Sequence, residues 1–340
     1  MTPASPLRVA VVGAGAIGAY VGAALARGGS DVVLIARGAH LRAMQDHGVR
    51  VLSPRGDFTA HPAATDDLAA VRDADVVFLA LKAHSLPAIA PQLGPLLGAQ
   101  TAVIAAQNGI PFWYFQHLAG PWRDWQLETV DPGGRIAAAI TPERVIGCVI
   151  YCSTEIVEPG VIRHVEGTRY AIGEPDGRLS ERCRRISAAF IAGGLKCPVE
   201  ADLREQIWVK LLGNAAFNPM SALTRATMAQ MGALPETRAT LRAVMEEAAA
   251  VAAALGVQLS VSVEKRLDGG IRVGEHKTSM LQDVEAGRPL ELDCITGAVV
   301  ELADRLGIPV PHTRTLYACT KLLDATLARQ RATAQAGSHA

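Results

Sequence analysis

The sequence predicts an α/β fold followed by an all-helical domain, on three observations. Residues 8–12 form a short valine-rich run that leads into a glycine-rich segment and then an alanine-rich helical pattern. Apolar runs at 31–35, 75–81 and 101–106 resemble strands of a buried parallel sheet. From residue 202 onward, helical periodicity replaces strand patterns. We therefore expect a sheet domain over residues 1–201, a helical substrate and catalytic domain over 202–330 and a disordered tail over 331–340.

Length and composition fit a two-domain cytoplasmic protein. The chain has 340 residues, of which 49% are hydrophobic and 19% charged, and its 33 basic residues balance 33 acidic ones. This balance favours neither nucleic acid nor an anionic membrane as a partner. Six cysteines are scattered without a CxxC pair, which indicates reduced thiols and no metal site. Residues 1–7 lack a signal-peptide pattern, and no apolar run approaches the roughly 18 residues of a membrane span.

The segment GAGAIG lies between the first strand and the first helix. Its glycines allow a tight turn, close approach of a pyrophosphate to the backbone, and close packing of helix on strand. A purely structural glycine turn is the alternative, but the flanking strand and helix are those that a dinucleotide site requires. We expect a Rossmann-type domain that binds its cofactor through Gly13, Ala14, Gly15, Ala16, Ile17 and Gly18.

The end of the second strand predicts NADP(H) as the cofactor. An NAD enzyme would place a carboxylate here for the ribose hydroxyls, whereas this chain has Ala36 and Arg37. The guanidinium offers donors for a 2′-phosphate, although a solvated surface arginine is the alternative. Lys82, after the strand at 75–81, is a second cofactor candidate or a solvated loop lysine. His84 more simply opens the next helix than donates a proton.

The region after the strand at 101–106 has several interpretations. Asn108 falls at the sheet edge where ligands bind, but Asn-Gly is also an ordinary turn. Phe112, Trp113, Tyr114 and Phe115 form a dense cluster in a chain that is 4% aromatic; a packed core corner is favoured over a specificity lid. Residues 120–144 are expected to form a long irregular connecting segment. Further elements are expected as strands at 144–152, 154–157, 160–165, 168–172 and 197–200 and a helix at 178–192.

A polar stripe marks the first helix of the second domain. Lys210, Asn214 and Asn218 fall at i, i+4 and i+8 on one helical face, among apolar neighbours such as Trp208 and Phe217. A lysine that reaches out to water is the simpler alternative for an isolated pair. A buried lysine and amides would require a ligand or a network. Further helices are expected at 235–255, 296–306 and 313–329, and their apolar, alanine-rich character offers a face for a homodimer.

Short segments in a fixed order over nearly the whole chain resemble the ketopantoate reductase family. They are GAGAIG, Leu81-Lys82-Ala83, Asn108-Gly109, Trp208-x-Lys210-Leu211 with Asn214 and Asn218-Pro219, Ser279-Met280-x-Gln282-Asp283, and Glu291-x-Asp293. The resemblance implies that Lys210 is the general acid and that Glu291 helps to hold it and the nicotinamide ribose. It also implies substrate contacts from Asn108, Asn214, Asn218 and Ser279, and cofactor contacts from Arg37, Lys82, Asn108 and the backbone near Ser153.

The implied activity is NADPH-dependent reduction of 2-dehydropantoate to (R)-pantoate, a step of pantothenate and coenzyme A biosynthesis. Hydride addition to a 2-keto carbon leaves an alkoxide, which a nearby ammonium can stabilise and protonate. Two departures bear on the substrate: the long segment between Gly109 and Gly147, and Met228 where the family often has an asparagine. The alternatives are therefore a reductase of a bulkier 2-keto acid and a non-catalytic NADPH sensor.

Overall fold

The computed structural model describes residues 5–118 and 120–337 and divides into two compact units. The first unit comprises Met1–Gln107, Pro111–Gln126 and Asp131–Leu203. The second comprises Asn108–Ile110, Leu127–Val130 and Arg204–Ala340. Two short pieces of the chain, one just after the third apolar run and one within residues 120–144, are thus part of the helical unit.

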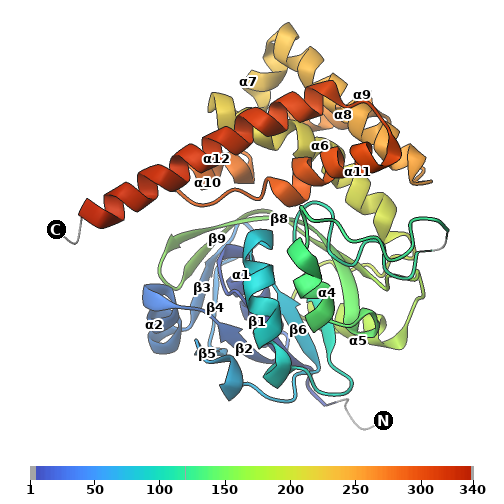
Figure 1. Cartoon of the computed structure of the whole chain (residues 1–340). Helices are drawn as coiled ribbons and strands as arrows, with labels where there is room; N and C mark the ends of the chain where they lie inside the picture. Colours follow the sequence, from blue (N-terminus) through green and yellow to red (C-terminus); the bar gives the residue numbers. More distant parts are fainter. Residues whose placement is uncertain (1–4, 119, 338–340) are drawn as a thin grey trace. The chain divides into compact units, whose positions relative to one another are not determined.

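The first unit is built on a mixed β-sheet (Figure 1). The sheet has nine strands in the order β4-β3-β9-β8-β7-β6-β1-β2-β5. Each pair of adjacent strands from β5 through to β8 in this order is parallel, and so is the pair of β3 and β9. The pairs of β8 with β9 and of β3 with β4 are antiparallel. The strands are β1 Arg8–Val12, β2 Asp31–Ile35, β3 Val49–Leu52, β4 Phe58–Ala60, β5 Ala63–Thr65, β6 Val76–Leu79, β7 Ala102–Ala105, β8 Val145–Glu158 and β9 Val161–Gly173.

Helices cover this sheet because their apolar faces match its buried strands. The helix α1 (Ala16–Arg27) packs on the strands together with α5 (Glu181–Ala192), and residues such as Val21, Leu25 and Phe190 are almost fully buried there. The unit also contains α2 (Gly38–His47), α3 (Leu86–Ile89) and α4 (Arg135–Ala139). The predicted α/β fold with a mixed far edge is confirmed.

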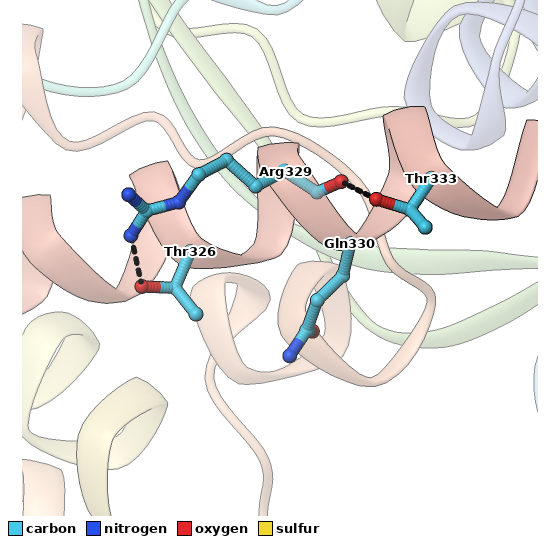
Figure 2. Close-up of a pocket in the computed structure, with 4 residues that line it drawn as sticks. All are labelled: Thr326, Arg329, Gln330 and Thr333. Atoms are coloured by element: carbon cyan, nitrogen blue, oxygen red, sulfur yellow. Dashed lines mark hydrogen bonds between the residues drawn. The ribbon is translucent and has the colours of Figure 1, made fainter. Parts of the chain in front are cut away.

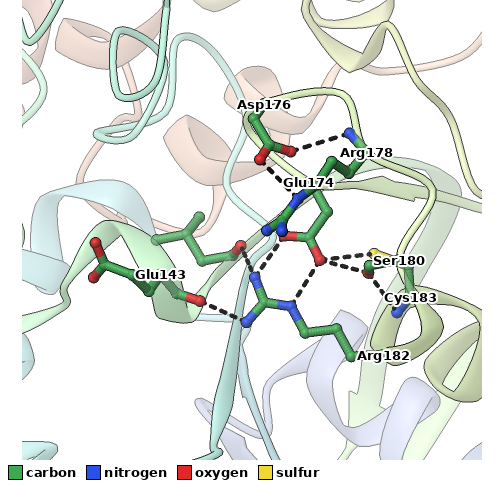
Figure 3. Close-up of polar contacts among 8 residues, drawn as sticks. Glu143, Glu174, Asp176, Arg178, Ser180, Arg182 and Cys183 are labelled. Atoms are coloured by element: carbon green, nitrogen blue, oxygen red, sulfur yellow. Dashed lines mark hydrogen bonds and ion pairs between the residues drawn. The ribbon is translucent and has the colours of Figure 1, made fainter.

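A buried ion pair joins the end of β9 to the start of α5. The Glu174 side chain is 1% exposed and its Oε2 lies 2.5 Å from Arg182 Nη2. Ser180 Oγ also donates to Glu174 Oε1, at 2.5 Å, and Arg182 donates to the carbonyl of Glu143 (Figure 3). Burial acts to raise the pKa of Glu174, but the hydrogen bonds from Arg182 and Ser180 outweigh it and leave the pKa below its usual value.

The second unit consists of helices around α8 (Pro235–Ala254). Leu241, Val244, Met245, Ala248 and Val251 form a buried stripe on α8 at helical spacing, which packs against its neighbours. The remaining helices are α6 (Leu203–Thr224), α7 (Met228–Ala233), α9 (Val263–Ile271), α10 (Ser279–Glu285), α11 (Ala298–Leu306) and α12 (Pro311–Gly337), with a π-helical turn at Asp293–Gly297. No helix in the described part of the chain is long and apolar enough to cross a membrane.

Several expected elements differ from the structure. The helix α12 runs to Gly337, so the expected disorder from residue 331 is wrong for the described part of that tail; alanine, glutamine and arginine favour helix there. Residues 338–340 lie outside the described residues. The four expected strands between 144 and 172 are two long strands, β8 and β9, whose pairing shifts register near Ser153. The expected strand at 197–200 makes only isolated bridges, at Lys196 and Val199.

Candidate functional site

The glycine segment forms the turn between β1 and α1, and its three glycines occupy different environments. Gly13 has φ +91°, and a Cβ there would lie 2.7 Å from Leu81 Cδ2. At Gly18 a Cβ would lie 2.3 Å from the carbonyl oxygen of Gly13. Gly15 differs, because no described atom that bears on its Cβ lies within 4 Å. Gly13 and Gly18 are thus required by the fold, whereas Gly15 borders open space.

Backbone hydrogen bonds show which amides of this segment could hold a phosphate. Gly13 and Ala14 donate to the carbonyl of Ile35, at 3.1 and 2.9 Å, and Gly15 donates to Gly13, at 2.7 Å. The helix α1 begins at Ala16. The first amides of a helix have no acceptor within the helix, and the first bond of α1 is donated by Ala19 to Gly15, so the amides of Ala16, Ile17 and Gly18 are suited to an anion.

The two cationic candidates follow the strands on either side of β1. Arg37 comes directly after β2 and Ala36, is exposed, and is the residue that precedes α2. Lys82 follows β6 and is half-buried. Because β2, β1 and β6 are adjacent and parallel, Arg37, the glycine segment and Lys82 share the carboxyl edge of the sheet.

Ser153 has a different setting in the first unit. It lies in β8 opposite Glu166 of β9, at a point where the pairing of the two strands is irregular. The last residue of β8 that pairs with β7 is Gly147, so Ser153 belongs to the part of β8 that extends beyond β7. It is half-buried.

In the second unit, α6 presents the predicted polar stripe. Lys210 Nζ donates to Asn108 Oδ1 at 2.8 Å, although the two residues are 102 positions apart in the chain. Lys210 and Asn214 are half-buried, and Asn218 is 5% exposed. An amide oxygen is an acceptor suited to the N–H of this amine. The structure therefore brings together the two residues that the sequence suggested for proton donation and for contact with both ligands.

Asn108 is held in place by the turn that follows it. Gly109 has φ +83°, and a Cβ there would lie 2.1 Å from the carbonyl oxygen of Cys294. That carbonyl accepts a hydrogen bond from the Ile110 amide at 2.8 Å. The Asn108-Gly109 pair is thus a turn, as one of the two interpretations of the sequence expected. The same turn also positions the Asn108 side chain that contacts Lys210.

The remaining candidates of this unit lie around α10 and the π turn. Ser279 is the exposed first residue of α10, and Glu291, 7% exposed, precedes the π turn. Thr278 caps α10 and contacts Ser221 Oγ, which in turn donates to the carbonyl of Asn218 at 2.9 Å. Sequence reasoning missed Thr278 because residues 275–283 alone resemble a solvated loop, and it missed Ser221, which follows the polar stripe on α6. A threonine three residues before the backbone amide of Leu281 was the available pattern for a helix cap.

The aromatic cluster is part of the packed core. Phe112, Trp113, Tyr114 and Phe115 are between 1% and 8% exposed. A Cβ at Gly147 would lie 2.4 Å from Trp113 Cζ2, so this glycine makes room for the indole ring. The favoured interpretation as a core corner is the one that this burial supports.

A surface pocket of about 510 Å³ lies on α12, and none of these candidates lines it (Figure 2). Its lining consists of Thr326, Arg329, Gln330 and Thr333, which come from successive turns of one helix. Arg329 Nη2 donates to Thr326 Oγ1 at 3.3 Å, and Thr333 Oγ1 donates to the carbonyl of Arg329 at 3.1 Å. We assign no role to this hollow.

Both units match known proteins. Residues 9–115 match the family described as ketopantoate reductase PanE/ApbA, and residues 202–324 match the C-terminal region of the same family. The 2-dehydropantoate 2-reductase of Mesorhizobium japonicum is 45% identical over 318 residues, which cover 93% of this chain and 98% of that protein. The corresponding protein of Halobacterium salinarum is 30% identical, over 93% of this chain and 98% of its own.

Solved structures agree with these sequence matches. The crystal structure of a PanE/ApbA family ketopantoate reductase from Ralstonia eutropha JMP134 has a TM-score of 0.82 and 30% identity, and the match covers 95% of this chain and all of the other, at 100%. D-mandelate dehydrogenase, solved with NADH and anilino(oxo)acetate, shares the fold at a TM-score of 0.81 and 20% identity, over 95% of this chain and 100% of that one. On the family matches over both units and the 45% identity, this chain belongs to the ketopantoate reductase family.

Proposed function

We propose that this protein reduces 2-dehydropantoate to (R)-pantoate with NADPH, as a step of pantothenate biosynthesis. The observation that carries the proposal is the contact of Lys210 Nζ with Asn108 Oδ1, at 2.8 Å, in a chain that is 45% identical to a named 2-dehydropantoate 2-reductase. A protonated amine held by an amide oxygen is a suitable donor to the alkoxide that hydride transfer creates.

The other candidates have complementary roles in this proposal. NADPH supplies the hydride and binds through the amides of the glycine segment, with the Arg37 guanidinium and the Lys82 ammonium at its 2′-phosphate end. Glu291 orients Lys210 and the nicotinamide ribose, and the backbone near Ser153 contacts the nicotinamide. Asn214, Asn218 and Ser279 bind the carboxylate and hydroxyl of the substrate.

A reductase of a bulkier 2-keto acid is the second candidate, and the observation in its favour is Met228. This residue begins α7, and its Cε lies 3.3 Å from the position of a Cβ at Gly270. An apolar side chain where relatives often carry an asparagine would favour a substrate with fewer hydroxyl groups. The aromatic cluster no longer supports this candidate, since its side chains are buried.

The proposal also covers assembly and location. We infer a cytoplasmic homodimer that associates through the apolar, alanine-rich helical unit, whose exposed large hydrophobic side chains include Leu234, Val273 and Leu322. Sedimentation of the purified protein tests the dimer, and a monomer at micromolar concentration would exclude it.

The activity is tested by NADPH oxidation with purified protein. The assay compares 2-dehydropantoate with a panel of bulkier 2-keto acids, and NADPH with NADH, and uses the Lys210→Ala variant as a blank. We expect turnover with 2-dehydropantoate and NADPH. Turnover confined to another keto acid would assign that acid as the substrate and leave the proposed mechanism unchanged. Tight NADPH binding without turnover on any keto acid would identify a sensor and exclude the enzyme.

A further inference from the structure

A π-helical turn separates Glu291 from the regular helix α11. The turn spans Asp293–Gly297, and the Leu292 carbonyl accepts from the amides of both Ile295, at 3.2 Å, and Gly297, at 3.1 Å. The second of these bonds joins residues five apart, which is the wide π spacing. Single π turns are rare and are found frequently at functional sites. Because the extra residue disturbs an otherwise regular helix, we expect contacts from neighbouring side chains to stabilise this turn.

Two side chains of α12 hold the first residue of the turn. Tyr317 Oη donates to Asp293 Oδ1 at 2.8 Å, and Lys321 Nζ lies 2.7 and 2.6 Å from the two carboxylate oxygens. Burial and the hydrogen bond to Asp293 raise the pKa of Tyr317, so its hydroxyl remains a donor. The tyrosine ring needs the absence of a side chain at Gly297, where a Cβ would lie 3.0 Å from Tyr317 Cε2. We call Asp293, Tyr317 and Lys321 the clamp.

The turn that the clamp holds is the support of Asn108. The Cys294 carbonyl, one residue after Asp293, accepts from the Ile110 amide at 2.8 Å, and it leaves no space for any residue but glycine at position 109. Asn108 Oδ1 then accepts from Lys210 Nζ. A continuous chain of contacts therefore runs from α12 through the π turn to the amine on α6.

We propose that Asp293 is a positioning residue for Lys210, fixed by Tyr317 and Lys321 so that the π turn holds Asn108 at hydrogen-bond distance from the amine. The proposal rests on the proposed function, because it assumes that Lys210 is the proton donor. It does not assume which keto acid is reduced.

An ordinary stabilising contact is the competing explanation. The Asp293 and Lys321 side chains are 43% and 49% exposed, and an exposed ion pair contributes little to stability. If stability were its only role, loss of the clamp would leave Asn108 and turnover unchanged. A positioning role instead predicts lower kcat at little cost in folding.

The test is the double variant Tyr317→Phe/Lys321→Gln in the full chain. The matched control is Arg314→Gln, also on α12, which removes an ion pair to Asp304 of similar exposure. We expect kcat with the keto acid to fall about tenfold in the double variant, with the KM for NADPH within about twofold and the control unaffected. Lys321→Arg keeps a positively charged side chain beside the Asp293 carboxylate, so it should retain most of the activity when Tyr317 is present.

Hydrogen exchange gives a readout that does not depend on activity. The Ile110 amide should exchange about tenfold faster in the double variant, whereas the Met228 amide, bonded to the His276 carbonyl at 3.1 Å in the same unit, should not change. If the double variant fails to fold, Lys321→Gln alone decides. Unchanged kcat and unchanged exchange at Ile110, in a protein whose wild type is active, would overturn the clamp. An inactive wild type would instead reject the proposed function, and the exchange rates would still report on the clamp.

Discussion

At the scale of single residues, the contact of Lys210 with Asn108 supports its proposed role as proton donor. Its Nζ donates to Asn108 Oδ1, and we predict that Lys210→Ala lowers kcat by about 10² to 10⁴, the usual contribution of a general acid. NADPH affinity should change little, because the glycine segment lies in the other unit. Steady-state kinetics and cofactor titration measure both effects. Lys265→Ala, on the exposed surface of α9, is the control, and wild-type turnover in Lys210→Ala would remove this lysine from its role.

Cofactor selection is a second property at this scale. Arg37→Ala should raise the Kd for NADPH by about tenfold or more and leave the Kd for NADH nearly unchanged, because a charge-assisted contact to a phosphate contributes about 1.5–3 kcal/mol. Arg42→Ala, at an exposed arginine within the adjacent helix α2, serves as the matched control. Fluorescence titration with both cofactors is the measurement. An equal loss for NADPH and NADH would contradict the assignment to the 2′-phosphate.

At the scale of elements, the turn at Gly109 shows how a glycine can be required twice. Its φ is +83°, and a Cβ would lie 2.1 Å from the Cys294 carbonyl oxygen. Gly109→Ala should therefore cost about 2–4 kcal/mol of stability and also reduce turnover, since the turn supports Asn108.

The control for that substitution is Gly274→Ala. Gly274 has a similar φ of +87°, but no described atom that bears on its Cβ lies within 4 Å, so only the backbone penalty of about 1–2 kcal/mol applies. Thermal unfolding compares the two variants. Equal destabilisation would mean that the Cys294 carbonyl moves aside, and that its close approach to a Cβ at position 109 contributes no measurable free energy.

The junction of β9 and α5 depends on a buried charge. Arg182→Met leaves the buried Glu174 carboxylate without its guanidinium partner, and we expect a loss of about 3–5 kcal/mol at pH 7. Arg184→Met, which removes an exposed pair with Glu181 on the same helix, should cost less than about 0.5 kcal/mol.

The pH dependence of this effect has a defined sign. The pKa of Glu174 is lowered in the folded wild type, so the ion pair stabilises the fold above the unfolded pKa of about 4.3, and this stability is lost as the pH falls through the folded value. Urea unfolding at several pH values should show that the free energies of unfolding of wild type and Arg182→Met approach each other at acidic pH. A difference that stays constant down to about pH 3 would contradict the electrostatic explanation.

At the scale of the whole molecule, the two units should respond differently to the cofactor. If NADPH binds the glycine segment, 100 times its Kd should stabilise the first unit by about 2.7 kcal/mol. Calorimetry with and without NADPH measures this shift, and it should persist in Lys210→Ala. An unchanged free energy of unfolding at saturating NADPH would mean that the glycine segment does not bind the cofactor.

Sequence alone determined those features whose causes are local. The order of β1, the glycine turn and α1 follows from consecutive residues, and the stripe of Lys210, Asn214 and Asn218 follows from helical periodicity. The expected disorder of the tail differs from the structure, because residues of high helix propensity let α12 continue to Gly337.

Tertiary structure decided what depends on residues far apart in the chain. The contact of Lys210 with Asn108 joins residues 102 positions apart, and the π turn after Glu291 is held by Tyr317 and Lys321, 24 and 28 positions beyond Asp293. Likewise, the burial of Trp113 depends on packing at Gly147. No periodicity encodes such contacts, because they form only when separate elements meet, whereas a turn or a helical face is encoded within a few residues.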